Sequence, residues 1–319
     1  MAATVTQKIA LNSPDEAIRF FGSFNQNIQL ITDCFAARII ARGNEIKVVG
    51  DEREVQQITR VLSEMRHLVA QRGFVNPEEI KYSIKMIKAD PDVQLSQIFS
   101  DSIPIYSLKK HIAPRTAGQK QYIDAIRQHD IVFAIGPAGT GKTYLAMAMA
   151  LAALKIGKVK KIILTRPAVE AGEKLGFLPG DLFEKVNPYL RPLYDALYDM
   201  MELKKVERLM SDDVIEVVPL AFMRGRTLHK SFVILDEAQN CTQNQMKMFL
   251  TRLGVDSKAV INGDVTQIDL PSPASSGLVE AARLLREING VEFVFFDQTD
   301  VVRHELVAKI IAAYQEDSD

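Results

Sequence analysis

The sequence predicts an α/β protein in which helices flank a parallel sheet, preceded by a small α+β domain. Beyond residue 116, apolar runs typical of buried strands alternate with helical patterns, as in a parallel sheet covered on both faces. One of these runs enters a glycine-rich turn, and a helical pattern follows at once. The start of the chain has a different order: strand, helix, helix, strand, strand, helix. We therefore expect a small domain over 1–72, a helix and connector over 73–113, and the α/β domain over 114–319.

The composition is that of an ordinary globular protein and excludes several classes of function. Hydrophobic residues make up 47% of the 319 residues and charged residues 25%, so a large core can form. The net charge of -1 excludes a globally basic nucleic-acid binder and leaves room only for a local patch. The two cysteines, Cys34 and Cys241, lack the spacing of a zinc site or a disulfide framework. No apolar run is long enough to cross a bilayer, so we expect a cytoplasmic protein without membrane contact.

Each element of the small domain follows from a local pattern. The segment "KIALNS" alternates like a short strand, and a helix follows with Ser13 as its N-cap and Pro14 in its first turn. A second helical pattern covers "IQLITDCF". The runs "ARIIAR" and "EIKVVG" around a Gly-Asn turn predict a hairpin. Apolar positions between Asp51 and Gln71 then predict a long amphipathic helix.

This order of elements is that of a KH domain, whose RNA-binding loop lies between its first two helices. Here that position holds "GSFN" instead of the GXXG that clamps a nucleotide backbone. Two interpretations therefore stay open: a KH-like domain that contacts RNA, and a small α/β unit without a nucleic-acid role. Further along, a capping signal at Asn76 predicts a short helix, and a connector follows.

The strands of the second domain are expected where short apolar runs stand between helical patterns. The candidate strands are residues 131–135, 161–165, 214–219, 232–235, 258–262 and 291–296. The first of them leads into "GPAGTGKT", which matches G-x-x-x-x-G-K-S/T, the pattern of a phosphate-binding loop, at every position. This loop comprises Gly136, Pro137, Ala138, Gly139, Thr140, Gly141, Lys142 and Thr143. With a strand before the loop and a helix after it, the pattern predicts a P-loop NTPase.

The loop and one downstream segment predict a site for the phosphates of a nucleotide. The glycines permit a sharp turn and let backbone N–H groups and the N-terminus of the next helix face the phosphates. Lys142 is expected to contact the β- and γ-phosphates, and the Thr143 hydroxyl to hold Mg²⁺. Downstream, "SFVILDEAQN" places Asp236 at the end of a buried strand, where its carboxylate can bind the same Mg²⁺. Glu237 is then the candidate general base for an attacking water.

Two further segments fit the same nucleotide cycle. In "VINGDVTQIDLP", Asp264 and Gln267 follow a strand and stand where a γ-phosphate would be sensed. Upstream of the loop, Gln119 and Tyr122 stand where the edge and the face of an adenine would be read. A role at the start of its own helix is the alternative for Gln119.

These motifs together resemble the PhoH-like ATPase family. The resemblance covers the chain from Pro114 onward and rests on "GPAGTGKT", "LTRPAVEAGEKLGFLPGDL", "RGRTL", "VILDEAQN", "NGDVTQIDLP" and "DVVRH". The residues before Pro114 are similar to the KH-like region of the long members. The resemblance implies one RecA-like sheet that binds and hydrolyses ATP with Mg²⁺, in a homo-oligomeric ring for which a hexamer is favoured. It also implies a role in RNA metabolism, with RNA and an endoribonuclease of ribosomal RNA maturation as partners.

The resemblance also raises the question of which arginine completes the site. Only about fifty residues follow Asp264, too few for the second RecA domain that supplies arginines in helicases. Either a neighbouring subunit supplies one or turnover is slow, because such an arginine is worth roughly 10³ to 10⁵ in rate. Candidates are Arg166, Arg224, Arg226 and Arg303, of which Arg166 and Arg303 follow strands near the nucleotide edge of the sheet.

The sequence thus supports two hypotheses about function. The first is a helicase-like ATPase that acts on RNA or on an RNA-processing partner, with RNA unwinding left open. The alternative is a nucleotide-gated adaptor that presents a nuclease, with hydrolysis only resetting the assembly. A small-molecule kinase is less favoured because no substrate lid stands out in the sequence.

Overall fold

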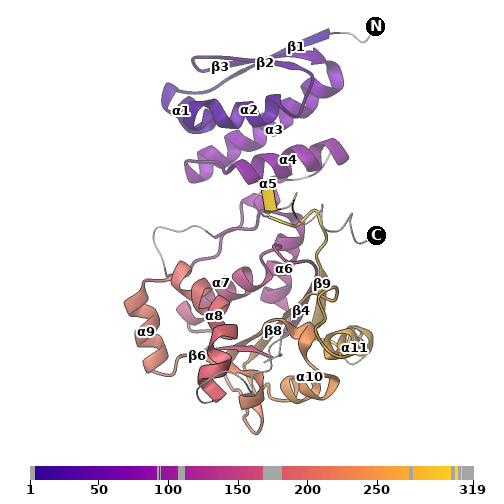
Figure 1. The fold of residues 1–319 in the computed structure, drawn as a ribbon. Helices are drawn as coiled ribbons and strands as arrows, with labels where there is room; N and C mark the ends of the chain where they lie inside the picture. Colours follow the sequence, from indigo (N-terminus) through magenta and orange to yellow (C-terminus); the bar gives the residue numbers. More distant parts are fainter. Residues whose placement is uncertain are drawn as a thin grey trace. The chain divides into compact units, whose positions relative to one another are not determined.

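The computed structural model describes residues 4–91, 93, 95–106, 112–167, 182–272, 276–302, 306–307 and 310. The chain forms two compact units, one of residues 1–102 with 113–116 and the other of residues 103–112 with 117–319. Figure 1 shows their helices and strands in colours that run from indigo to yellow along the sequence. Each unit has a hydrophobic core of its own. Among the described residues, no helix has the length and apolar character of a membrane span.

The first unit is built on a three-stranded antiparallel sheet in the order β1-β3-β2. Its strands are β1 (Thr4–Ala10), β2 (Arg38–Arg42) and β3 (Glu45–Asp51), and β3 pairs with both others. The predicted hairpin of β2 and β3 is therefore confirmed. The first strand begins and ends earlier than "KIALNS" predicted, because its polar first half pairs with the end of β3, as in Thr4 opposite Asp51. Cross-strand pairing, and not the local alternation of side chains, sets its limits.

The described helices of the first unit follow the predicted order of elements, except that the last of them lies where the sequence predicted a connector. They are α1 (Pro14–Phe21), α2 (Gln26–Thr32), α3 (Glu52–Arg72), α4 (Pro77–Ala89) and α5 (Leu95–Phe99). The Ser13 hydroxyl caps α1 by accepting the Glu16 N–H at 3.1 Å, as predicted. Between α1 and α2, in place of a GXXG loop, a short 3-10 turn (Ser23–Asn25) holds Phe24 exposed with a φ of 52°.

The second unit is built on a six-stranded sheet in the order β6-β5-β7-β8-β4-β9, and all of its recorded pairings are parallel. The strands are β4 (Ile131–Ile135), β5 (Lys161–Arg166), β6 (Ile215–Pro219), β7 (Ser231–Leu235), β8 (Lys258–Gly263) and β9 (Val291–Phe295). Each lies within one residue of its predicted limits. The α/β fold with a parallel sheet is therefore confirmed.

Alternate residues of these strands face two separate layers of helices (Figure 1). On one face, Val132 and Ile234 pack in a core with α6 (Ala117–Gln128), α7 (Lys142–Lys155), α8 (Leu182–Met200) and α9 (Leu203–Ser211). On the other face, Phe133 and Val233 pack with α10 (Gln243–Leu250) and α11 (Gly277–Leu284). Because all the strands point the same way, the carboxyl ends of β4, β7 and β8 meet at one edge of the sheet. Ligands bind at this edge in open α/β sheets.

Candidate functional site

The predicted phosphate loop lies between β4 and α7 and borders a cavity of about 300 Å³. The cavity is lined by Ala138, Gly139, Gly141, Lys142, Thr143, Tyr144, Asp236, Glu237, Asn262, Gly263, Asp264 and Gln267. These residues come from the loop with the start of α7, from the end of β8, and from the segments that follow β7 and β8. The structure therefore brings together three segments that are far apart in the sequence.

The glycines of the loop are required by its backbone. Gly139 and Gly141 have φ angles of 86° and 80°, in the left-handed region that favours glycine. Gly136 has a φ of 155°, and a Cβ atom there would lie 2.5 Å from the carbonyl oxygen of Phe296. A side chain at Gly136 would therefore push the loop away from the segment that follows β9.

The Lys142 ammonium lies inside the loop and donates hydrogen bonds to the carbonyl oxygens of Gly136 at 2.6 Å and Pro137 at 2.8 Å. Burial lowers the pKa of Lys142, while the charges of Asp264, Asp236 and Glu237 act in the opposite direction. The amine is thus held by neutral carbonyls beside a group of carboxylates. An anionic ligand in the cavity would offer it stronger charge-assisted hydrogen bonds.

Thr143 and Asp236 meet at the edge of the sheet. The Thr143 hydroxyl donates to Oδ1 of Asp236 at 2.6 Å. Burial raises the pKa of Asp236, and the hydrogen bond from Thr143 opposes that rise. A hydroxyl and a carboxylate are hard oxygen donors of the kind that Mg²⁺ takes, and Mg²⁺ needs only one or two protein ligands beside phosphate oxygens. The described residues contain no larger cluster of His, Cys, Asp and Glu side chains that would suit another metal.

Glu237 follows Asp236 in a left-handed backbone conformation with a φ of 51°. Such a conformation costs about 1–2 kcal/mol for a residue with a Cβ atom. It turns the carboxylate toward two partners: Oε1 forms an ion pair with Arg166 at 2.9 Å, and Oε2 accepts a hydrogen bond from the Gln239 amide at 2.6 Å. Both oxygens of the candidate base therefore have partners within the same chain.

Two amide side chains tie the turn after β7 to the loop after β8. Oε1 of Gln239 accepts the N–H of Asp264 at 3.0 Å. Asn240 does the same one residue on, since its Oδ1 accepts the N–H of Asp269 at 2.8 Å. A movement of Glu237 would therefore displace Asp264, because Gln239 is hydrogen-bonded to both.

Within the described residues, two polar atoms beside the cavity have no hydrogen-bond partner. They are Oδ2 of Asp264 and Nδ2 of Asn262, and both are buried. Buried polar atoms are usually paired, and unpaired ones are found at sites that bind a ligand or water. One donor and one acceptor at the edge of the same cavity fit a polar, hydrogen-bonding ligand.

Gln119 and Tyr122 of α6 pack on the back of the phosphate loop. The Gln119 side chain is buried and donates to the Thr140 carbonyl at 3.1 Å, so it supports the loop from within the chain. Its role in reading adenine stays a prediction. The Tyr122 ring is fully buried, so the expectation that it stacks on an adenine is wrong. Its hydroxyl donates to Oδ1 of Asn262 at 2.7 Å and lies 3.3 Å from the Lys142 carbonyl.

Comparison with known proteins identifies the family. The family model described as PhoH-like protein matches residues 111–315. The chain is 52% identical to a PhoH-like protein of Bacillus subtilis (strain 168) over 304 residues, which cover 95% of each chain. The chain belongs to the PhoH-like family. It is also 37% identical to Protein PhoH of Escherichia coli (strain K12), over 87% of this chain and 75% of that protein. The Sulfolobus solfataricus SWI2/SNF2 ATPase core in complex with dsDNA aligns with a TM-score of 0.31 at 16% identity, over 46% of this chain and 31% of that one.

The candidate arginines of this PhoH-like protein have different surroundings. Arg166 ends β5 and lies in the site, where it binds Glu237 and also donates to the Tyr189 carbonyl at 3.1 Å. Arg226 forms an ion pair with Glu216 at 2.7 Å, and Arg224 is exposed. Arg303 lies outside the described residues. Just before it, the Val302 N–H donates to the Gly139 carbonyl at 3.0 Å, so the segment after β9 contacts the phosphate loop.

The sequence did not reveal two contacts of this PhoH-like site. The first is the hydrogen bond of Tyr122 with Asn262, and the second is the ion pair of Arg166 with Glu237. The only signs of the first contact in the sequence were a tyrosine among the apolar positions of a helix and a later strand that ends at an asparagine. For the second, an arginine directly after a buried strand was the only sign.

Proposed function

We propose that this PhoH-like protein is a Mg²⁺-dependent ATPase. The observation that carries the proposal is the 2.6 Å hydrogen bond between Thr143 and Asp236. It joins the last residue of the phosphate loop to the carboxylate at the end of β7, which are the two groups that hold Mg²⁺ in P-loop nucleotide hydrolases. Family membership supports the same assignment.

The residues of the loop would hold the phosphates of ATP. Backbone N–H groups of residues 138–143 and the N-terminus of α7 supply partial positive charge. Lys142 exchanges its two carbonyl partners for oxygens of the β- and γ-phosphates, which are stronger acceptors. Thr143 and Asp236 would hold Mg²⁺, whose charge neutralises the phosphates when it is bound. Gln119 keeps the loop in shape through Thr140.

Glu237 is our candidate for the base that accepts a proton from water. For this role, at least one of its oxygens must be released by Arg166 or Gln239, since both are occupied in this arrangement. Arg166 would then be free to stabilise negative charge on the transferred phosphoryl group. Gln267, which lines the same cavity, is the candidate that orients the γ-phosphate or the water.

Measurement of phosphate release tests these roles. Lys142→Ala should abolish turnover, and Glu237→Gln should lower kcat by about 10² to 10⁴, the usual contribution of a general base. Lys247→Ala, at an exposed position of α10, is the matched control and should leave turnover unchanged. Wild-type turnover in Glu237→Gln would mean that the base is another group. Wild-type turnover in Lys142→Ala would exclude the whole site.

We further propose that the protein acts as a homo-oligomeric ring, with a hexamer favoured, in cytoplasmic RNA metabolism. Among the described residues, no arginine lines the cavity at the phosphate loop, and Arg166 is engaged by Glu237 until that ion pair opens. An arginine from a neighbouring subunit would supply the missing positive charge. RNA and an endoribonuclease of ribosomal RNA maturation are the proposed partners, on the strength of the family. The mass of the particle with and without ATP·Mg²⁺ tests the ring, and a monomer in both conditions would overturn it.

A nucleotide-gated adaptor is the second candidate function. The occupied carboxylate of Glu237 favours it, because a base that must first lose a partner suits slow turnover. In this case ATP binding would order an assembly around a nuclease. Strand-separation assays with ATP and with a non-hydrolysable analogue discriminate the two, since unwinding that requires hydrolysis would exclude the adaptor.

A further inference from the structure

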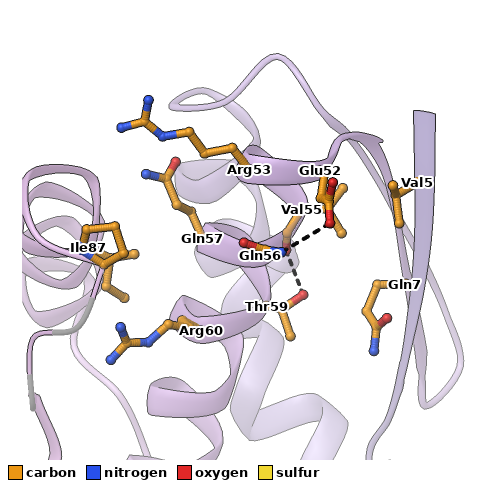
Figure 2. Close-up of a pocket in the computed structure, with 11 residues that line it drawn as sticks. Val5, Gln7, Glu52, Arg53, Val55, Gln56, Gln57, Thr59, Arg60 and Ile87 are labelled. Carbon is orange, nitrogen blue, oxygen red and sulfur yellow. Dashed lines mark hydrogen bonds between the residues drawn. The ribbon is translucent and has the colours of Figure 1, made fainter. Parts of the chain in front are cut away.

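A hollow of about 710 Å³ lies over the N-terminal half of α3 in the first unit. It shares no lining residue with the cavity at the phosphate loop. Its walls are α3 itself, Val5 and Gln7 of β1, and Ile87 of α4 with the following Pro91. Figure 2 shows that the side chains of α3 divide between a side that faces β1 and a side that faces Ile87.

The side that faces Ile87 carries three polar side chains in a row. Arg53, Gln57 and Arg60 are spaced four and three residues apart, which places them on one face of a helix. The Cα atoms of the two arginines are then about 10 Å apart along the axis, at 1.5 Å per residue. Figure 2 shows all three side chains pointing away from β1. The row therefore presents two guanidinium groups with a primary amide between them.

Gln57 is the unusual member of this row. Its side chain lines the hollow, is only 8% exposed, and makes no hydrogen bond within the part of the chain that the structure describes. Because the side chain lines the hollow, its remaining exposed surface faces the hollow and not the core. The amide is therefore available to a ligand there.

The charges along the row are also unbalanced. In the described residues, neither Arg53 nor Arg60 forms an ion pair, and Arg60 donates one hydrogen bond, to the Val93 carbonyl at 2.7 Å. Burial raises the pKa of Glu64, and the charge of Arg60 opposes that rise, so this carboxyl is within electrostatic range of Arg60. The one carboxylate that lines the hollow, Glu52, lies on the side of β1 and accepts from the Gln56 amide at 3.5 Å. Most of the guanidinium N–H groups thus remain available to a ligand.

We propose that the row of Arg53, Gln57 and Arg60 binds a phosphate group. Guanidinium groups form paired, charge-assisted hydrogen bonds with phosphate oxygens, and the Gln57 amide donates to a third oxygen. A terminal phosphate offers three oxygens to these three donor residues, and a phosphodiester offers two non-bridging ones. The phosphate belongs either to a small phosphorylated molecule or to the backbone of a nucleic acid, because both present anionic phosphate oxygens to guanidinium groups. The site is independent of the proposed ATPase activity.

Peptide-resolved hydrogen exchange on the full-length protein tests the site, because it separates α3 from the phosphate loop. The phosphate loop is first saturated with Mg·ADP, and inorganic pyrophosphate or a short single-stranded RNA is then titrated. We expect slower exchange in the first half of α3 with at least one of the two probes. Arg53→Gln should weaken the probe affinity about tenfold, as should Gln57→Glu, which places a negative charge in the row. Arg38→Gln, at an exposed position of β2 outside the hollow, should bind the probe like the wild type.

The outcomes separate the two sources of the phosphate and a purely structural role. Protection by pyrophosphate supports a small phosphorylated ligand, and protection by RNA alone supports a nucleic-acid backbone. Protection by neither probe, or unchanged affinity in Arg53→Gln, overturns the proposal. Gln57→Leu should keep or raise the Tm while the affinity falls. A lower Tm with unchanged affinity would show that Gln57 serves only the fold.

Discussion

The hydroxyl of Tyr122 links α6 to the nucleotide edge of the sheet, and Tyr122→Phe removes only this hydroxyl. The ring is fully buried, and its hydroxyl donates to Oδ1 of Asn262 at 2.7 Å. The amide nitrogen of Asn262 already lacks a hydrogen-bond partner in the part of the chain that the structure describes. The substitution would therefore leave a buried amide without any hydrogen bond on its side chain.

The expected loss in the free energy of unfolding is about 1–3 kcal/mol, the usual cost of a buried polar group that loses its partner. In a unit of this size, each kcal/mol lowers the Tm by about 2–4 °C, so a fall of roughly 2–12 °C is expected. Nucleotide affinity should also fall, because the hydroxyl lies 3.3 Å from the carbonyl oxygen of Lys142, the first residue of α7.

Calorimetry gives the Tm, and a fluorescent nucleotide gives the dissociation constant. Tyr198→Phe is the matched control, because Tyr198 lies on α8 in the same unit, is 39% exposed and should change the free energy by less than about 0.5 kcal/mol. Equal Tm values for Tyr122→Phe and the wild type would refute the reasoning, since no buried hydrogen bond would then have been lost.

Three further substitutions test other parts of the structure. Gly136→Ala should abolish nucleotide binding, because its Cβ would lie 2.5 Å from a backbone oxygen. Gly157→Ala is strained by a φ of 72° but its Cβ meets nothing within 4 Å, so it controls for the loss of a glycine and should bind nucleotide normally. Burial first, and then the charge of Lys158, lower the pKa of Lys258 to about 8 from 10.5. Between these values the unfolded chain binds more protons than the folded one, so the free energy of unfolding should rise with pH relative to Lys258→Met. Glu79→Gln should cost about 3–5 kcal/mol in urea unfolding, because it leaves a buried arginine without its ion-pair partner.

For each of these substitutions, one result would contradict the prediction. Nucleotide binding by Gly136→Ala at wild-type affinity would mean that the loop does not pack against the segment after β9. If the difference in the free energy of unfolding between wild type and Lys258→Met does not change from pH 8 upward, the lysine stays charged in the folded state. A loss below 1 kcal/mol for Glu79→Gln would place the arginine in water.

The parallel sheet was predictable because its strands are mostly short runs of apolar residues in the sequence. A strand buried on both faces, such as β7 with the sequence SFVIL, can be recognised from its own residues, without knowledge of the strands that pair with it. Helix starts were predictable for a similar reason, since Ser13 and Asn76 act on N–H groups only three residues away. The limits of β1 were not predictable, because this edge strand is polar and exists through its pairing with β3.

The same distinction between local and distant interactions applies to the site. The phosphate loop is a local device, so its sequence pattern alone places the glycines and Lys142. The partners of Glu237 are not local: Arg166 comes from β5, and only the order β5-β7 within the sheet puts the two side chains together. The burial of Tyr122 likewise depends on packing between α6, β8 and the segment after β9. Side-chain partners chosen by strand order have no signature in a single sequence.

The position of β4 in the sheet has a consequence for folding during synthesis on the ribosome. β4 precedes both of its neighbours, β8 and β9, by more than half of the second unit. The strand, the phosphate loop and α7 therefore emerge from the ribosome long before the partners that hold them, and such distant pairings form late. Only when Phe296 has been made can its N–H bond to the Ile135 carbonyl at 2.8 Å and its backbone close over Gly136. Until then the nascent chain carries an unprotected apolar strand, and the phosphate loop reaches its folded form only after β9 has been made.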